Sequence, residues 1–172
     1  GTLALNDHPV DMRLATLTLG QMTPTGTEAG LNGVGVFQFN QGLVDVTTLN
    51  MAVCSGNSPT AGARGTMTVG DNGTLNVGSI SLGNGTGTNA ICVGTLEIAG
   101  GVVNCAGNIF KTSTTNCTGN ITNTSGELNL GGLSRIGTTA LPLDTMEMSD
   151  AVLQLTPAGN GTNVVVTTLV TG

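Results

Sequence analysis

The sequence predicts an all-β fold: a parallel β-helix, or β-solenoid, of about five to six coils with three short strands per coil. Two observations carry this prediction. Similar segments recur along the chain, with starts at Gly1, Gly35, Gly65 and Gly94 that are spaced by 34, 30 and 29 residues. Within each segment, apolar and polar residues alternate, which is the period of a half-buried strand and not of a helix.

The repeats organise the whole chain as one domain. The segments GVFQFNQGLVDVTTLNMA from Gly35 and GTMTVGDNGTLNVGSISLG from Gly65 show the pattern best. Weaker copies begin at Gly126 and at Asp144, so repeat starts near 1, 35, 65, 94, 126 and 144 divide residues 1–172. No copy can bury its apolar face alone, so stacked coils must form the core.

Each strand of a coil contributes a pair of inward-pointing residues. In the first strand the expected pairs are Leu3/Leu5, Phe37/Phe39, Met67/Val69, Leu96/Ile98, Leu128/Leu130 and Met146/Met148. In the second strand they are Val10/Met12, Val44/Val46, Leu75/Val77, Val103/Cys105 and Leu153/Leu155. In the third strand they are Leu17/Leu19, Leu49/Met51 and Ile80/Leu82. An antiparallel β-sandwich is the alternative fold, and the nearly equal register of the copies favours the solenoid.

The composition excludes several classes of partner. Four basic against ten acidic residues give a net charge of -6, so no basic stripe exists to bind nucleic acid. No apolar stretch approaches the roughly 20 residues of a membrane span. The absence of Trp and Tyr removes the usual surfaces on which sugars stack. We expect no nucleic acid partner, no membrane insertion and no cofactor.

The repeat segments resemble the autotransporter-associated β-strand repeats of bacterial surface proteins. The resemblance covers about Gly1 to Thr112 well and the remainder loosely. It implies a parallel β-helix, an extracellular or cell-surface location and a role in adhesion or surface structure, with no catalytic residues.

The four cysteines, Cys54, Cys92, Cys105 and Cys117, have no CxxC spacing, and the sole histidine, His8, lies far from them. Disulfides are therefore preferred over a zinc site. Of the three possible connectivities, Cys54–Cys92 with Cys105–Cys117 is favoured, and four buried thiols are the alternative.

An outward ladder is expected on the second strand, because the alignment superposes Asp11, Asp45, Asn76 and Asn104. Coils stack about 4.8 Å apart, so Asp11 and Asp45 could share a calcium ion. A metal-free Asn/Asp ladder is the preferred interpretation.

Six Asn-X-Ser/Thr triplets mark candidate glycosylation sites on turns and linkers. They begin at Asn72, Asn84, Asn116, Asn120, Asn123 and Asn160. Covalent glycans are thus a possible modification, although chance alone explains much of the count.

No catalytic constellation is expected. The cluster of Asp7, His8, Asp11 and Arg13 is the one mixed group of ionisable residues, and only Asp45 faces it from a neighbouring coil. Glycan cleavage needs paired carboxylates or an equivalent acid and base. We predict that the protein is not an enzyme.

The leading functional prediction is a self-assembling extracellular structural protein, a surface or filament subunit. Neither end of the chain carries a polar capping segment, and a head-to-tail homopolymer follows from stacking or from donation of the last strand. The alternative is that the chain is a fragment of a longer repeat protein whose flanking coils supply the caps. The uncharged C-terminal run that would join subunits contains Asn163, Val164, Val165, Val166, Leu169 and Val170. The alternatives are an adhesin that displays linkers such as 20–34 and 53–64, and a polysaccharide-active β-helix enzyme.

Overall fold

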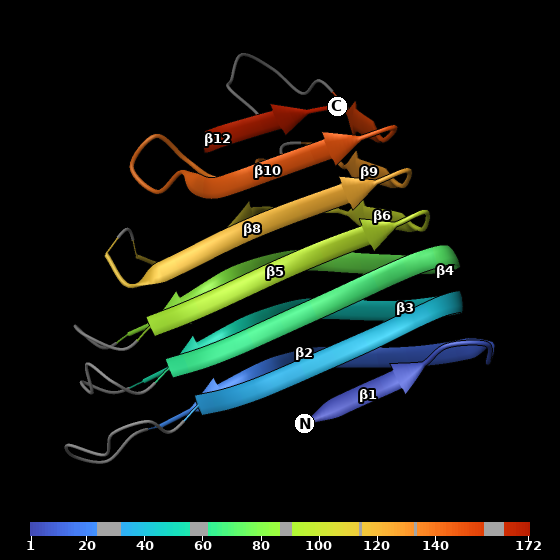
Figure 1. The fold of residues 1–172 in the computed structure, drawn as a ribbon, viewed down its shortest axis with the longest axis horizontal. Helices are drawn as coiled ribbons and strands as arrows, with labels where there is room; N and C mark the ends of the chain where they lie inside the picture. Colours follow the sequence, from blue (N-terminus) through green and yellow to red (C-terminus); the bar gives the residue numbers. More distant parts are fainter. Residues whose placement is uncertain (24–31, 56–61, 87–90, 114, 133, 157–163) are drawn as a thin grey trace.

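The chain folds into a β-solenoid, described by a computed structural model for residues 1–23, 32–55, 62–86, 91–113, 115–132, 134–156 and 164–172 (Figure 1). All pairings between its strands are parallel, and the strands belong to one continuous sheet. Among the described residues, no helix is long and apolar enough to cross a membrane. The predicted all-β solenoid is confirmed, with a stack close to the predicted number of coils.

Short strands dominate the C-terminal half, whereas the coils of the N-terminal half run as long bent strands. The strands are β1 (Thr2–Leu5), β2 (Val10–Met22), β3 (Asn32–Cys54), β4 (Gly62–Gly85), β5 (Ile91–Ala99), β6 (Val102–Cys105), β7 (Ile109–Phe110), β8 (Cys117–Thr124), β9 (Glu127–Leu130), β10 (Leu143–Ser149), β11 (Val152–Leu155) and β12 (Val166–Thr171).

The strands stack in three columns, which we call the first, second and third faces. The first face holds β1, the start of β3 and of β4, then β5, β8, β10 and β12. The second face holds the start of β2, the middle of β3 and of β4, then β6, β9 and β11. The third face holds the ends of β2, β3 and β4, then β7 and isolated bridges at Ile136 and Val164.

The core is a set of apolar columns that run along the solenoid axis between the faces. One column of the first face is Leu3, Phe37, Met67, Leu96, Ile121, Met146 and Leu169. Its central members Met67, Leu96 and Ile121 are fully buried. Alternation along each strand sends these side chains inward, and stacking of the coils buries them.

A column of glycines begins the coils because backbone passes too close for a side chain. Gly35, Gly65, Gly94 and Gly119 lie in register on the first face. A Cβ atom on Gly65 would lie 2.4 Å from the carbonyl oxygen of Leu19 and 2.7 Å from the nitrogen of Ala52. Three of the predicted repeat starts are therefore positions that only glycine fits.

One predicted repeat start is wrong. Residues 127–130 of β9 lie on the second face, where they pair with β6 and β11, so Gly126 does not begin a coil. The coil begins at Gly119, and Ile121 and Asn123 take the inward positions that we had assigned to Leu128 and Leu130. The error arose because β8 has a polar sequence, CTGNITNT, that hides its inward column.

The expected register of the second strand of the first coil is also wrong, by two residues, whereas the first and third strands of this coil pair as expected. Met12 and Leu14, and not Val10 and Met12, lie beside Val44 and Val46. A shift of two residues keeps every side chain on the same side of a strand. The alternation of apolar and polar residues therefore does not distinguish the two registers.

Candidate functional site: an asparagine-lined groove

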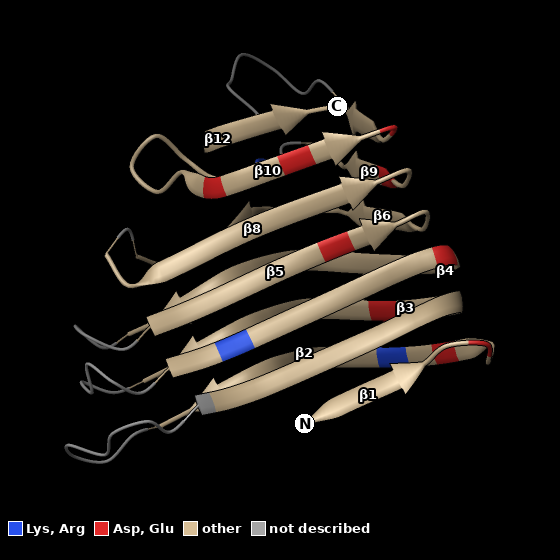
Figure 2. Cartoon of the chain, in the orientation of Figure 1, with Lys and Arg blue, Asp and Glu red and all other residues tan. Residues whose placement is uncertain are grey.

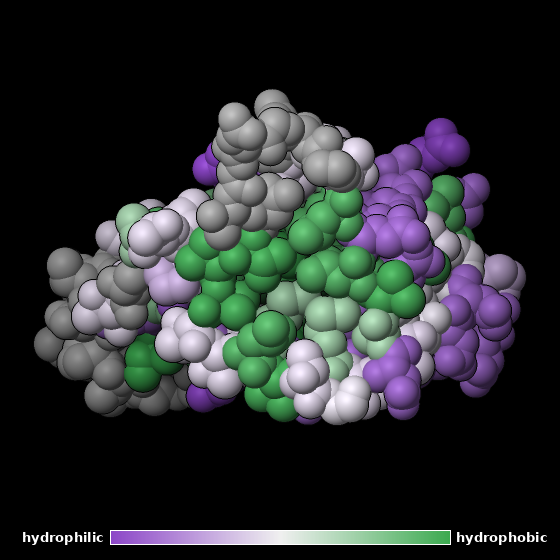
Figure 3. All heavy atoms as spheres, turned by 90° about the horizontal axis from the view of Figure 1, so that it is seen from above, coloured by the Kyte–Doolittle hydropathy of each residue, from purple (hydrophilic) through white to green (hydrophobic). Residues whose placement is uncertain are grey.

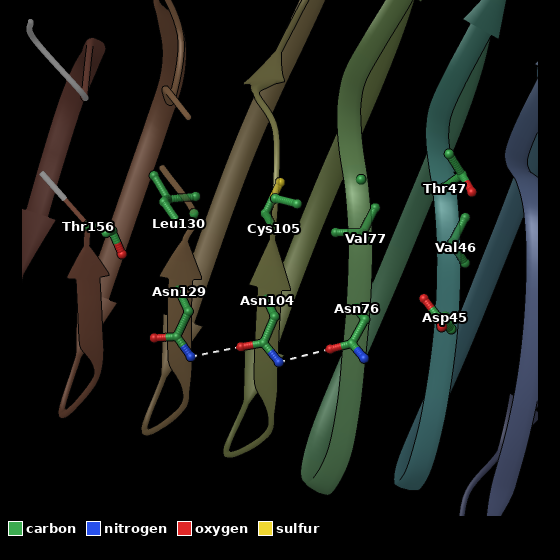
Figure 4. A pocket seen from close by; sticks show the side chains of 13 residues that line it. Asp45, Val46, Thr47, Asn76, Val77, Asn104, Cys105, Asn129, Leu130 and Thr156 are labelled. Atoms are coloured by element: carbon green, nitrogen blue, oxygen red, sulfur yellow. Dashed lines mark hydrogen bonds between the residues drawn. The ribbon is translucent and has the colours of Figure 1, made fainter. Parts of the chain in front are cut away.

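A shallow groove of about 570 Å³ crosses the stacked coils where the second face ends (Figure 4). The last residues of each second-face segment form it, and the position that follows the inward residue is small in three successive coils: Gly78, Ala106 and Gly131. Thr47 and Thr156 lie at its two ends. The groove runs along the solenoid axis because each coil contributes the same positions.

One wall of the groove is a ladder of side-chain amides. Asn76, Asn104 and Asn129 stack in register, and Figure 4 shows their side chains in one row. The Nδ2 atom of Asn104 donates to Oδ1 of Asn76 at 2.9 Å, and Nδ2 of Asn129 donates to Oδ1 of Asn104 at 2.9 Å. The amide dipoles therefore all point the same way along the axis.

The ladder has an unsatisfied end. Oδ1 of Asn129 is buried and accepts no hydrogen bond from the described part of the chain, and the next residue in the column is the exposed Gln154. A buried acceptor without a donor costs about 1–3 kcal/mol. A ligand or side chain that donates a hydrogen bond at this point would recover that energy.

The other end of the ladder differs from the expectation. Asp45 lies in register with Asn76 on one side and with Arg13 on the other, whereas Asp11 lies beside Leu43. The predicted ladder is thus confirmed for Asp45, Asn76 and Asn104, wrong for Asp11, and extended by Asn129. The proposed sharing of calcium by Asp11 and Asp45 loses its geometry, because a cation, Arg13, lies beside Asp45.

Among the residues that the structure describes, no group of three or more His, Cys, Asp or Glu side chains could hold a metal ion. Asp7, from the mixed cluster of the first coil, is engaged with Asn40. The backbone nitrogen of Asp7 donates to Oδ1 of Asn40 at 2.9 Å, and Nδ2 of Asn40 donates to Oδ1 of Asp7 at 3.3 Å. This pair closes the turn between β1 and β2 and does not form an acid–base dyad.

The charged residues are few, and Figure 2 shows both signs close together in the first coil. The one salt bridge that the structure shows among the described residues joins Nζ of Lys111 to Oδ2 of Asp144 at 2.7 Å. Lys111 is buried, and Oδ2 of Asp144 also accepts a 2.8 Å hydrogen bond from the backbone of Gly119. No sequence pattern predicts this contact, since 33 residues separate its partners.

The cysteines fall into two separate places, and none forms a disulfide in the structure. Cys105 belongs to the main core, and its thiol donates to the carbonyl oxygen of Gly107 at 3.2 Å. Cys54, Cys92 and Cys117 belong to a second, smaller apolar cluster. The expected Cys105–Cys117 disulfide is wrong, because the two residues belong to different clusters on different faces.

The candidate glycosylation sites differ in exposure. Asn72 is exposed at the bend of β4, and Asn116 is half-buried just before β8. Asn84 and Asn120 are half-buried and lie within β4 and β8, not in linkers. Asn160 lies outside the described residues.

The prediction of a glycosylation site at Asn123 is wrong. Its side chain is fully buried, Oδ1 accepts from the nitrogen of Gly126 at 3.1 Å, and Nδ2 donates to the carbonyl oxygen of Val152 at 3.4 Å. An attached sugar would have to occupy the core.

The C-terminal run forms the last strand of the first face. In β12, Leu169 pairs with Met146 and Val170 with Glu147 of β10. Before it, Val164 bridges to Ile136, and the backbone of Val165 donates to the carbonyl oxygen of Ile136 at 2.7 Å. Asn163 lies outside the described residues.

Comparisons with protein-family models, with curated proteins and with solved structures found no match. The resemblance to autotransporter-associated repeats therefore stays a prediction, and the geometry of this chain carries the functional argument.

Proposed function

We propose that this chain is a non-catalytic structural subunit that assembles end to end with further copies of itself, in an extracellular or cell-surface setting. The observation that carries the proposal is that both ends of the solenoid present the apolar columns of the core. Each end is the kind of surface on which another coil stacks.

The C-terminal end is the more exposed of the two. Figure 3 shows apolar residues gathered over the middle of this end. Of the inward residues at this end, Leu169 is 58% exposed and Leu155 39%. Met148, Leu153, Val164 and Val166 pack against the core while only partly buried.

The N-terminal end presents the same columns from the opposite side. Leu3 is 47% exposed. The inward residues Leu5, Val10, Met12, Leu14 and Leu17 are all only partly buried. The outer edges of β1 and β12 carry backbone groups that a further strand could pair with.

The two ends are complementary in their order of strands. The C-terminal end stops at β12 on the first face, with β11 uppermost on the second face. The N-terminal end starts with β1 on the first face, followed by β2 on the second. A junction without a break needs β2 of the next copy to stack on β11, so that Met12 lies over Leu153.

In such a junction β1 and β12 would compete for one position. Both belong to the column that contains Leu3 and Leu169, and β1 pairs with β3 through Leu3 and Phe37. We infer that β12 replaces β1 against β3 of the next copy, with Leu169 packed beside Phe37. Since this contact joins different surfaces, it repeats without closing and produces a filament.

Size-exclusion chromatography with light scattering, followed by negative-stain microscopy, tests the proposal. We expect the full chain to form filaments as its concentration rises. Leu169→Asp should leave folded monomers, because the inward position of the junction cannot hold a charge. Thr168→Asp is the matched control, since Thr168 lies in an outward column beside the uncharged Thr145, and it should assemble.

Deletion of residues 163–172 should likewise leave folded monomers. A full chain that stays monomeric at high concentration would contradict the proposal. So would a Leu169→Asp variant that assembles as readily as Thr168→Asp.

A binding module is the second candidate function, and the asparagine-lined groove favours it. The unsatisfied Oδ1 of Asn129 and the spaced amides suit an elongated ligand rich in hydroxyl donors. A screen against neutral oligosaccharides tests this candidate. Binding by the monomeric Leu169→Asp variant, lost in Asn104→Leu, would support it, and no binding to any oligosaccharide would rule it out.

The extracellular setting is supported by the exposed sequon at Asn72. Expression in a cell that glycosylates asparagine, with mapping of the modified peptides, tests the covalent glycans. We expect Asn72 to be modified and the buried Asn123 to stay bare.

A further inference from the structure

A second apolar cluster, distinct from the main core, lies where the third face of one coil meets the first face of the next. We call it the thiol cluster: Cys54, Cys92 and Cys117, buried together with Ala52 and Ala63. The exposed fractions of the three cysteines are 0%, 0% and 3%. Three of the four cysteines of the chain are thus gathered in one small space.

Two of these cysteines are direct neighbours on adjacent strands. Cys92 of β5 and Cys117 of β8 are register partners in a parallel pair. Paired strands lie about 4.8 Å apart, which falls within the Cα–Cα range of about 4.4–6.8 Å found across disulfides. Both side chains point into the thiol cluster, so their Cα–Cβ vectors are nearly parallel, and the Cβ atoms must move from about 4.8 Å to the roughly 3.5–4.5 Å of a disulfide when the bond forms.

The two sulfur atoms border the same point. A Cβ atom on Gly85 would lie 2.9 Å from Sγ of Cys117 and 3.1 Å from Sγ of Cys92. The glycine therefore provides the space into which both thiols reach. Cys54 precedes Gly85 in the same column of the third face, and it also hydrogen-bonds with Cys92.

The contact between the thiols of Cys92 and Cys117 shifts their pKa values in opposite directions. The hydrogen bond with Cys92 lowers the pKa of Cys117 to about 6, against the opposing effect of burial, with further help from Thr112 and from backbone groups of Gly85 and Ser113. The same hydrogen bond, together with burial, raises the pKa of Cys92. Cys117 is the thiol that ionises, and a thiolate is the nucleophile of disulfide exchange.

Cys117 is also the more accessible of the two. It retains 3% of its surface, and the exposed Thr112 lies 3.8 Å from its sulfur through Oγ1. Of the two thiols, Cys117 is therefore the one nearer to the surface.

We propose that Cys92 and Cys117 form a covalent modification site, oxidised by a low-molecular-weight disulfide to a bond that joins β5 to β8. The Cys117 thiolate attacks one sulfur of the small disulfide, and one small thiolate leaves. Cys92 then loses its proton to this thiolate and attacks Sγ of Cys117, which releases the second small thiolate, and that thiolate takes up from water the proton that Cys117 lost when it ionised. Two protein thiols are oxidised by two electrons in total, and one small disulfide is reduced to two thiols.

Cys105 provides an internal control. Burial raises its pKa to about 11, and its thiol donates to the carbonyl oxygen of Gly107 within the main core. It has no cysteine neighbour in its column, where it lies between Val77 and Leu130. We expect Cys105 to stay reduced under conditions that oxidise the Cys92–Cys117 pair.

Peptide mapping of the full chain tests the proposal. The folded protein is incubated with oxidised or reduced glutathione, its remaining thiols are alkylated in denaturant, and it is digested with trypsin and a glutamate-specific protease. Cleavage after Arg64, Glu97, Lys111 and Glu127 puts each cysteine on a different peptide. Oxidation should link peptide 65–97 to peptide 112–127, with loss of the mass of two hydrogen atoms.

The variants sharpen the assignment. Cys105→Ser should keep the link, and both Cys92→Ser and Cys117→Ser should lose it. The link closes a loop, so oxidation should raise Tm by roughly 5–10 °C, and a reductant should reverse the rise. The proposal is overturned if the wild-type peptides 65–97 and 112–127 stay unlinked and alkylated, or if Cys92 is instead linked to Cys54 or Cys105; the wild-type mapping is independent of whether any variant folds.

Discussion

The central and terminal coils of this solenoid carry the same kinds of side chain and yet differ in burial. Leu96 lies in the middle of a first-face column and is 0% exposed, whereas Leu3 and Leu169, at the two ends of that column, are 47% and 58% exposed. The strands around them have the same alternation and the same register. The difference teaches that a coil does not bury its own inward residues: the coil above and the coil below bury them.

The largest expected effect is therefore that of a charge in a central coil. Phe39→Asp should abolish folding, because Phe39 is 1% exposed and nothing nearby pairs with a buried carboxylate. Gln38→Asp, one residue away and on the outward side of β3, should keep the wild-type melting curve in circular dichroism. Equal loss of structure in both variants would mean that the inward register is wrong.

A second pair of variants, with a smaller expected loss of stability, compares the centre and the end of one column directly. Leu96→Ala should lower the free energy of unfolding by about 2–5 kcal/mol, since it leaves a cavity among fully buried neighbours. Leu3→Ala should cost less than about 1 kcal/mol in the monomer, because water already reaches this side chain. Urea denaturation measures both values, and similar losses would contradict the dependence of burial on neighbouring coils.

Most of this architecture could be predicted from the sequence, for a physical reason. Alternation with period two and the recurring glycines both report on the strand columns, and the third-face pairs such as Leu49/Met51 are buried as expected. The register of the second strand of the first coil could not be predicted, because a shift of two residues preserves the alternation. Asn129 was missed because Gly126 was aligned with the glycines that begin first-face strands. The segments GELNLG from Gly126 and GTLNVG from Gly73 nevertheless share the same second-face pattern.

Asn123 shows that a polar sequence can hide a buried position. It occupies an inward column with Phe39, Val69 and Ile98, and its amide bonds to backbone groups of Gly126 and Val152. An inward asparagine in a polar strand resembles a linker residue in sequence, and only the stacked neighbours show that it is buried.

A smaller loss of stability is expected when asparagine side chains are removed, and it should be larger for a buried amide than for one in the groove. Asn123→Ala should destabilise the protein by about 1–3 kcal/mol, because it leaves two backbone groups with no side-chain partner in the core. Asn104→Ala removes hydrogen bonds that line an open groove, where water can replace them, and should cost about 0.5–1 kcal/mol. Thermal or urea denaturation ranks the two, and the reverse order would show that the ladder is a main source of stability.

The smallest expected effect is that of calcium. Asp11 and Asp45 are not register partners, and Arg13 lies beside Asp45, so calcium should change Tm by less than about 1 °C. A rise of several degrees that Asp45→Asn removes would show that the first coils rearrange to bind the ion.

The most direct test of the account is hydrogen–deuterium exchange measured at low and high protein concentration. The account predicts that amides in β4 and β5 exchange slowly at both concentrations, because coils cover them on both sides. Amides in β12, and those of β3 that pair with β1, should be weakly protected at low concentration and become strongly protected as copies join. Protection of β12 that does not change with concentration, in a chain that remains monomeric, would contradict the claim that the open ends bury each other.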